Sequence, residues 1–132
     1  ENTYGAVSVM DAFGFQHGDN YDHLDDRHDC FRTMAKKIQN NPMIHGAAGP
    51  SENFIYLIDH IFEDYEPDVS IFLGHIGCKH TWASAKMVTD MIQKKYGLPS
   101  LYLDVDGIDG RYKTHEEITG ALAQYFDTVV NK

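Results

Sequence analysis

Residues 68–105 read DVSIFLGHIGCKHTWASAKMVTDMIQKKYGLPSLYLDV, a strand pattern, a helix pattern and a second strand pattern in succession. The apolar runs at 68–73 and 100–105 each follow a proline, which ends the helix before it. Between them, apolar residues recur at three- and four-residue spacing over residues 85–92, and Gly97 closes this helix as a C-cap. A strand, a crossover helix and a strand predict an α/β fold with parallel strands.

The pattern continues on both sides of this unit. An apolar run from Tyr4 to Met10 predicts a further buried strand. The apolar spacing predicts three more amphipathic helices, at residues 31–38, 54–62 and 118–129. Helix-capping residues and early acidic residues predict helix starts at Ser51, Thr81 and Thr114.

The predicted fold class is therefore α/β, with one domain spanning residues 1–132. We expect a three-layer, Rossmann- or flavodoxin-like domain in which helices flank a short parallel sheet. Three strands are fewer than the roughly four to six of most sheets, and the first predicted strand begins close to residue 1. We therefore expect a fragment of a larger, two-domain subunit, whose missing strand another chain or the longer parent supplies.

Composition excludes several classes of partner. The 132 residues carry a formal net charge of -9, which would repel nucleic acid and anionic membrane surfaces. The longest apolar stretches are far shorter than the roughly 20 residues that span a bilayer. The two cysteines form neither a C-x-x-C pair nor a disulfide framework, so we expect a cytoplasmic location.

Cys78 is the candidate site residue. It lies in the segment GHIGCKHTW, residues 74–82, after a strand and before a helix, where open parallel sheets bind ligands. The helix dipole and Lys79 would favour its thiolate, and Gly74 and Gly77 would leave room for a bulky cofactor. The alternative is a small, half-buried apolar side chain in a turn between a strand and a helix.

Two other metal sites remain open from the sequence. His75, Cys78 and His80 could bind zinc, although their spacing matches no standard zinc motif and a fourth ligand is not obvious. Residues 16–30, QHGDNYDHLDDRHDC, are crowded with carboxylates and imidazoles. Such runs are usually solvated loops, but this one could also hold a metal ion.

Residues 104–110, DVDGIDG, match two known motifs only in part. An EF-hand loop would require an oxygen ligand where Ile108 stands and a glutamate where His115 stands. A strand followed by D-x-D-G also resembles the nucleophile motif of haloacid-dehalogenase-type phosphatases, but Ile108 replaces the usual threonine. The simplest interpretation is that the first two aspartates close a strand, while Asp109 and Arg111 pair or cap locally.

Residues 74–118, GHIGCKHTWASAKMVTDMIQKKYGLPSLYLDVDGIDGRYKTHEEI, resemble the C-terminal part of a subunit of the 2-hydroxyacyl-CoA dehydratases. This family includes 2-hydroxyglutaryl-CoA dehydratase and is related to benzoyl-CoA reductase. The resemblance covers the cysteine after a strand, the helix, the G-L-P turn, the strand ending in acidic residues and the D-x-R-Y-K segment. The beta-type subunit is the more similar of the two.

The resemblance implies a cofactor and its ligands. Such subunits consist of two Rossmann-like halves that hold a 4Fe-4S cluster through cysteine thiolates. Cys78 matches the ligand from the C-terminal half, which would place His75, Lys79 and His80 in its second shell. Cys30 lies on no cluster-ligand motif, and the N-terminal ligand cysteines are absent from this sequence. We therefore expect the isolated 132-residue chain to bind no intact cluster and to be inactive.

The resemblance also implies a reaction and partners. The family is a group of lyases of anaerobic amino-acid fermentation that eliminate water from a (R)-2-hydroxyacyl-CoA to give a 2-enoyl-CoA. An ATP-hydrolysing activator delivers one electron, and the reaction passes through a ketyl radical. The expected partners are a homologous subunit in a heterodimer, this activator and the acyl-CoA substrate. The alternative function is a non-catalytic docking or electron-transfer module of the same superfamily.

Overall fold

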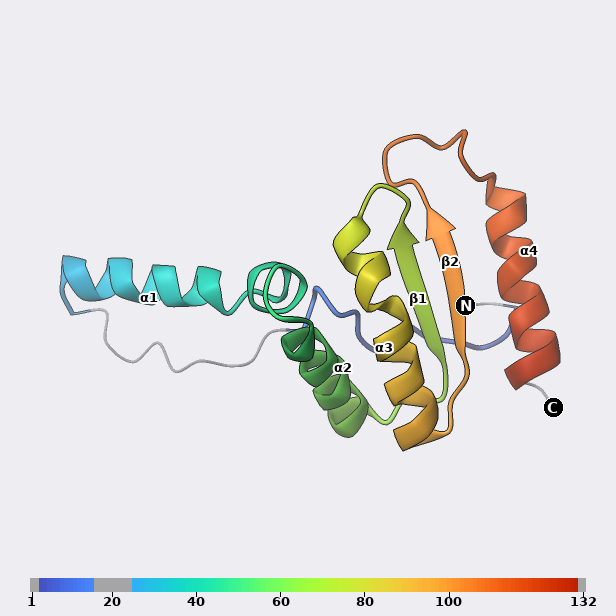
Figure 1. The fold of residues 1–132 in the computed structure, drawn as a ribbon, viewed down its shortest axis with the longest axis horizontal. Helices are drawn as coiled ribbons and strands as arrows, with labels where there is room; N and C mark the ends of the chain where they lie inside the picture. The colour runs from blue at the N-terminus through green and yellow to red at the C-terminus, as the bar shows by residue number, and fades with distance from the viewer. Residues whose placement is uncertain (1–2, 16–24, 131–132) are drawn as a thin grey trace. The chain divides into compact units, whose positions relative to one another are not determined.

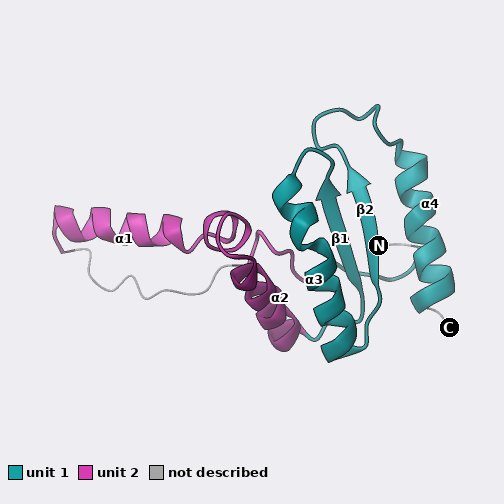
Figure 2. Ribbon diagram, in the orientation of Figure 1, with its two compact units in different colours: residues 1–8, 66–132 teal, residues 9–65 magenta. Residues whose placement is uncertain are grey.

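The structure is a computed structural model that describes residues 3–15 and 25–130. Its elements in chain order are α1 (Arg27–Gln39), η1 (Met43–Ala47), α2 (Ser51–Tyr65), β1 (Ser70–His75), α3 (Lys79–Tyr96), β2 (Ser100–Val105), α4 (His115–Tyr125) and η2 (Phe126–Val130), where η denotes a π-helix (Figure 1). The chain divides into two compact units, residues 1–8 with 66–132, and residues 9–65 (Figure 2).

The first unit, residues 1–8 with 66–132, contains a two-stranded parallel sheet. Strands β1 and β2 pair in register from Ser70 with Ser100 to His75 with Val105. Helix α3 packs against both strands, and α4 packs against β2 (Figure 1). The sequence-based prediction of an α/β fold with a short parallel sheet flanked by helices is thus confirmed.

Helix α3 connects the two strands and buries the side chains that its spacing predicted, including Ala85, Val88 and Ile92. It ends at Gly97, whose φ of 73° is the left-handed conformation that favours glycine, so the predicted C-cap is confirmed. The predicted start at Thr81 is wrong. Cys78 is the N-cap, because its carbonyl already accepts the helical hydrogen bond from the Trp82 N–H at 3.2 Å.

Helix α4 begins with the predicted cap at Thr114. The Thr114 hydroxyl accepts a hydrogen bond from the Glu117 N–H, and the Glu117 carboxylate accepts one from the Thr114 N–H, which completes a capping box. At its other end, the Tyr125 hydroxyl donates to the Pro99 carbonyl at 2.6 Å and lies 3.5 Å from the Ser70 carbonyl. Tyr125 therefore ties α4 to the amino ends of both strands.

The predicted strand from Tyr4 to Met10 is wrong. Residues 5–11 form neither helix nor strand, and the side chains of Val7 and Val9 are 70% and 51% exposed. An apolar run becomes a strand only where its backbone hydrogen bonds find a neighbouring strand. Here the Tyr4 ring instead stacks on Phe126 of η2, with ring centroids 4.9 Å apart.

The second unit, residues 9–65, contains α1, η1 and α2. Asp26 caps α1 by accepting hydrogen bonds from two backbone N–H groups of its first turn. Helix α2 buries Phe54, Leu57, Ile61 and Phe62, as its spacing predicted, whereas the apolar side chains Phe31, Met34 and Ile38 of α1 are exposed. No helix in residues 3–15 or 25–130 is long and apolar enough to cross a membrane.

Candidate functional site

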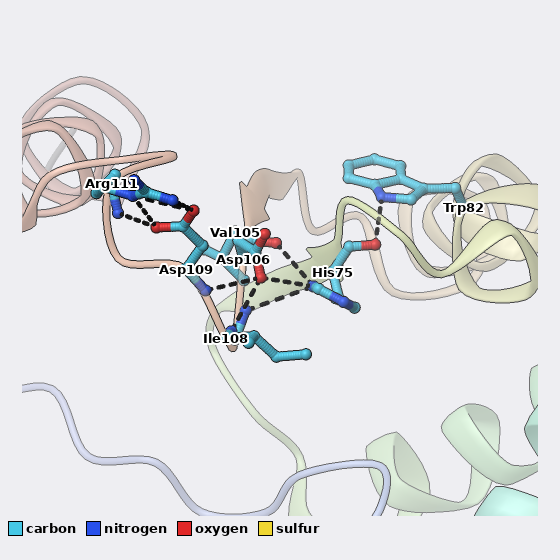
Figure 3. A network of polar contacts seen from close by, with 8 residues as sticks. His75, Trp82, Val105, Asp106, Ile108, Asp109 and Arg111 are labelled. Carbon is cyan, nitrogen blue, oxygen red and sulfur yellow. Dashed lines mark hydrogen bonds and ion pairs between the residues drawn. The ribbon is translucent and has the colours of Figure 1, made fainter.

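Two turns meet at the carboxyl end of the parallel sheet: residues 76–78 after β1 and residues 106–114 after β2. His75 joins them, with Nδ1 3.4 Å from the Val105 carbonyl oxygen and 3.7 Å from Asp106 Oδ1 (Figure 3). The Gly107 N–H also points at Nδ1, at 3.4 Å. The imidazole of His75 therefore links the cysteine-bearing turn to the loop after β2.

Cys78 is held in this turn through its backbone and its side chain. Its N–H donates to the His75 carbonyl at 2.8 Å, and its half-buried sulfur lies 2.8 Å from the Thr81 hydroxyl oxygen. This hydrogen bond is the main cause that lowers the pKa of the Cys78 thiol below its usual value. The backbone N–H groups of Thr81 and His80 also lower it, although neither completes a capping hydrogen bond to the sulfur.

Lys79 and His80 occupy the first two positions of α3, and both are exposed. The sequence predicted that Lys79 and the helix dipole favour the thiolate. The main cause that lowers the pKa of Cys78 is the hydrogen bond from the Thr81 side chain, and the N–H groups at the start of α3, which form the positive end of the helix dipole, also contribute, whereas Lys79 is not among the causes. A Thr three residues after a cysteine at a helix start is the signal that could have identified this partner.

Gly74, in β1, and Gly77, in the turn after it, each lie against another side chain of the first unit. A Cβ built on Gly74 would lie 2.3 Å from a ring carbon of Trp82, and a Cβ on Gly77 would lie 3.3 Å from His75 Nε2. The Trp82 indole lies against Gly74. It donates its N–H to the His75 carbonyl at 3.2 Å (Figure 3). The absent side chains thus make room for Trp82 and His75.

The loop after β2 is organised by its own carboxylates. Asp106 Oδ1 accepts hydrogen bonds from the backbone N–H groups of Ile108 and Asp109, at 2.9 and 3.1 Å, and these donors lower the pKa of Asp106. Arg111 binds the Asp109 carboxylate through Nε and Nη2, at 2.8 and 2.6 Å (Figure 3). The predicted local pairing of Asp109 with Arg111 is confirmed.

Asp104 is the second anchor of this loop, and the sequence did not reveal its partners. Its carboxylate accepts hydrogen bonds from Lys113 Nζ at 2.5 Å and from the Tyr112 hydroxyl at 2.7 Å. Lys113, followed by Tyr112, lowers the pKa of Asp104 to about 2. Since Asp104 and Asp106 both hold the loop in place, their contacts favour the structural interpretation of the D-x-D-G segment over a phosphatase site.

We expect Asp104 to make the stability of the first unit depend on pH. Its pKa is about 2 in the folded protein and about 3.9 in an unfolded chain. The stabilisation is therefore fully present above pH about 4 and is lost as the pH falls from about 4 to about 2. Urea unfolding across this range should show a shallower pH dependence for Asp104→Asn than for the unchanged protein.

A second variant, Lys113→Met, removes the main partner of Asp104 and should also make the pH dependence shallower. Asp104→Asn should also be the less stable protein at pH 7, because it loses the charge that Lys113 contacts. Equal pH dependence of Asp104→Asn and the unchanged protein would contradict the assignment.

Neither metal site left open by the sequence is assembled in the part of the chain that the structure describes. Within residues 3–15 and 25–130, no group of three or more His, Cys, Asp or Glu side chains is placed to hold a metal ion. His75, Cys78 and His80 are thus not brought together as zinc ligands. Of the acidic, histidine-rich segment 16–30, residues 16–24 lie outside the described residues.

Comparison with known proteins matches the chain to a family. A family model described as 2-hydroxyglutaryl-CoA dehydratase, D-component, matches residues 1–126. The matched range includes β1, the Cys78 turn, α3, β2 and the loop anchored by Asp104. No curated protein and no solved structure gives a significant match.

Proposed function

The chain belongs to the 2-hydroxyglutaryl-CoA dehydratase D-component family, and on this basis we propose that it forms part of an iron-sulfur 2-hydroxyacyl-CoA dehydratase, in which Cys78 is one thiolate ligand of a 4Fe-4S cluster. The observation that carries the proposal is the environment of Cys78. Its sulfur lies at the carboxyl end of a parallel strand, at the start of α3, and accepts a hydrogen bond from Thr81 when ionised.

Cys78 suits the role of one ligand. Iron-sulfur clusters are held by cysteine thiolates, and the lowered pKa of Cys78 favours the thiolate. No group of three or more His, Cys, Asp or Glu side chains that could hold a metal ion exists among the described residues. The remaining ligands are therefore proposed to come from cysteines outside the segment that surrounds Cys78, in the complete subunit.

The neighbouring residues of this chain would position the ligand. The His75 carbonyl accepts a hydrogen bond from the Cys78 N–H, and the His75 imidazole contacts Asp106. These two contacts hold the turn and the loop after β2 together. Lys79 and His80 directly follow Cys78 at the start of α3 and are exposed, so their side chains are accessible to a bound group. We propose that these three residues surround the ligand and orient it without binding the cluster themselves.

The proposed reaction is the elimination of water from a (R)-2-hydroxyacyl-CoA to a 2-enoyl-CoA through a ketyl radical. When bound, the cluster supplies the one-electron chemistry that this elimination requires, and the protein supplies position and electrostatics. The proposed partners are a homologous subunit, an ATP-dependent activator that delivers the electron, and the acyl-CoA substrate. The proposed location is the cytoplasm.

The test is Cys78→Ser in the complete dehydratase, assembled anaerobically from the subunit that contains this chain and its homologous partner. We expect Cys78→Ser to lose the iron and sulfide of one cluster and to show no dehydration when the activator and ATP are supplied. The measurements are iron and sulfide per protein, the electron paramagnetic resonance spectrum and the rate of 2-enoyl-CoA formation.

The matched control is Cys30→Ser, the chain's other cysteine, which should retain iron, sulfide and dehydration. Full iron and sulfide in Cys78→Ser would refute the ligand assignment. If the unchanged protein contains iron and sulfide but does not form 2-enoyl-CoA, the result would favour the alternative of an electron-transfer module.

A further inference from the structure

Thr81 has no role in the ligand set, yet its side chain contacts the Cys78 sulfur. The Thr81 hydroxyl oxygen lies 2.8 Å from Sγ, one turn along α3 from the N-cap. Both residues are fixed in place: the Cys78 N–H donates to the His75 carbonyl, and the Thr81 carbonyl accepts from the Ser84 hydroxyl at 3.0 Å. The backbone on both sides of the contact therefore holds the two side chains together.

The direction of this hydrogen bond follows from the ionisation of the sulfur. A thiolate carries no proton, so the Thr81 hydroxyl must be the donor whenever Cys78 is ionised. Hydrogen bonds to charged acceptors are stronger than neutral ones. Hydrogen bonds to ligand sulfurs also influence the reduction potential of an iron-sulfur cluster, because they withdraw electron density from the sulfur.

We propose that Thr81 is a positioning residue for Cys78: its hydroxyl donates to the thiolate, holds the sulfur in one orientation at the carboxyl end of the sheet, and raises the reduction potential of the cluster. The last part rests on the proposed function, since it requires Cys78 to be a cluster ligand. The hydrogen bond by which Thr81 holds the thiolate requires no cluster. It can therefore be tested separately on the 132-residue chain.

Two substitutions separate the hydroxyl from the shape of the side chain. Thr81→Val keeps the branched shape and removes the donor, whereas Thr81→Ser keeps the donor. Thr119→Val is a matched control, because it removes a threonine hydroxyl of α4 that donates to the His115 carbonyl. Fluorescence of Trp82, the chain's single tryptophan, checks that each variant is folded.

The first measurement needs no cluster. Iodoacetamide alkylates the chain at about pH 10, where free thiols are ionised, and mass spectrometry follows the peptides that contain Cys78 and Cys30. We expect Thr81→Val to speed alkylation of Cys78 by about threefold, because a thiolate that has lost its hydrogen bond is the stronger nucleophile. Thr81→Ser should react like the unchanged chain, and Cys30 should react equally in all variants.

The second measurement uses the assembled dehydratase. Anaerobic redox titration, followed by electron paramagnetic resonance, should give a more negative midpoint potential for Thr81→Val, and Thr81→Ser and Thr119→Val should keep the unchanged value. Equal alkylation rates of Cys78 in Thr81→Val and in the unchanged chain would overturn the proposal that Thr81 donates to the thiolate and holds it. If Cys78→Ser loses iron but Thr81→Val keeps the unchanged midpoint potential, only the proposed effect of Thr81 on the reduction potential is overturned.

Failure of the proposed function gives a different pattern. If Cys78→Ser keeps its full iron content, the ligand role and the effect of Thr81 on the potential are both overturned. The alkylation rates then still decide whether Thr81 holds the thiolate.

Discussion

Replacing Leu103 with alanine will lower the free energy of unfolding of the first unit by about 2–5 kcal/mol, the usual range for a buried leucine replaced by alanine. Leu103 lies in the middle of β2 and is 2% exposed. Side chains alternate along a strand, so Leu103 points away from the α3 side, where Tyr102 contacts Thr89 of that helix. The loss consists of the transfer energy of the removed atoms and the cavity that remains.

The matched control is Leu73→Ala. Leu73 is the residue of β1 that pairs with Leu103, but it is 61% exposed. Exposed positions usually change stability by no more than about 0.5 kcal/mol, so the two leucine-to-alanine substitutions should differ severalfold. Urea unfolding followed by Trp82 fluorescence measures both. Equal destabilisation by the two variants would contradict the assignment of Leu103 to the core.

Gly74→Ala will destabilise the same unit by about 1–3 kcal/mol, as overpacked sites usually do. The added Cβ would stand 2.3–2.4 Å from two carbons of the Trp82 ring, much closer than real Cβ contacts. The ring cannot move away without loss, because its N–H donates to the His75 carbonyl. Thermal unfolding followed by circular dichroism should therefore show a lower midpoint for Gly74→Ala.

Two further variants make the cause of this destabilisation testable. Gly107→Ala should leave the midpoint nearly unchanged, because a Cβ there meets no atom within 4 Å. In a Trp82→Ala background, Gly74→Ala should cost much less, since the overlapping ring is gone. If Gly74→Ala costs the same with and without Trp82, the overlap is not the cause.

Local patterns predicted the regular elements well. The helices α1 to α4 and the strands β1 and β2 were expected at nearly their observed positions, and so were the C-cap at Gly97 and the N-cap at Thr114. These features depend on the residues within one or two turns of the chain. The parallel pairing also followed, because a helix between two adjacent strands leaves few other arrangements.

Predictions failed where distant residues decide the outcome. The run from Tyr4 to Met10 has the composition of a strand, but strand formation depends on a pairing partner that composition does not reveal. The sequence does not reveal which side chain lies against Gly74, and only the fold shows that it is Trp82. The contact between Asp104 and Lys113 likewise depends on how the loop after β2 folds back.

The candidate site was predictable in location but not in chemistry. The sequence placed Cys78 between a strand and a helix, at the end of the sheet where His75 and Asp106 are found. It predicted that the helix dipole and Lys79 favour the thiolate, whereas the hydrogen bond from the Thr81 side chain is the main cause of the lowered pKa. The contact of 2.8 Å between the Thr81 hydroxyl and the Cys78 sulfur could be predicted only from the true start of α3. The sequence placed this start three residues too late.

The hydrogen bonds of Tyr125 have a consequence for synthesis on the ribosome. Translation proceeds from the N-terminus, so β1, α3 and β2 emerge before the helix that carries Tyr125. A nascent chain that stops before this residue lacks the hydroxyl that contacts the carbonyls of Ser70 and Pro99. The amino ends of the two strands are therefore joined through α4 only after Tyr125 has emerged from the ribosome.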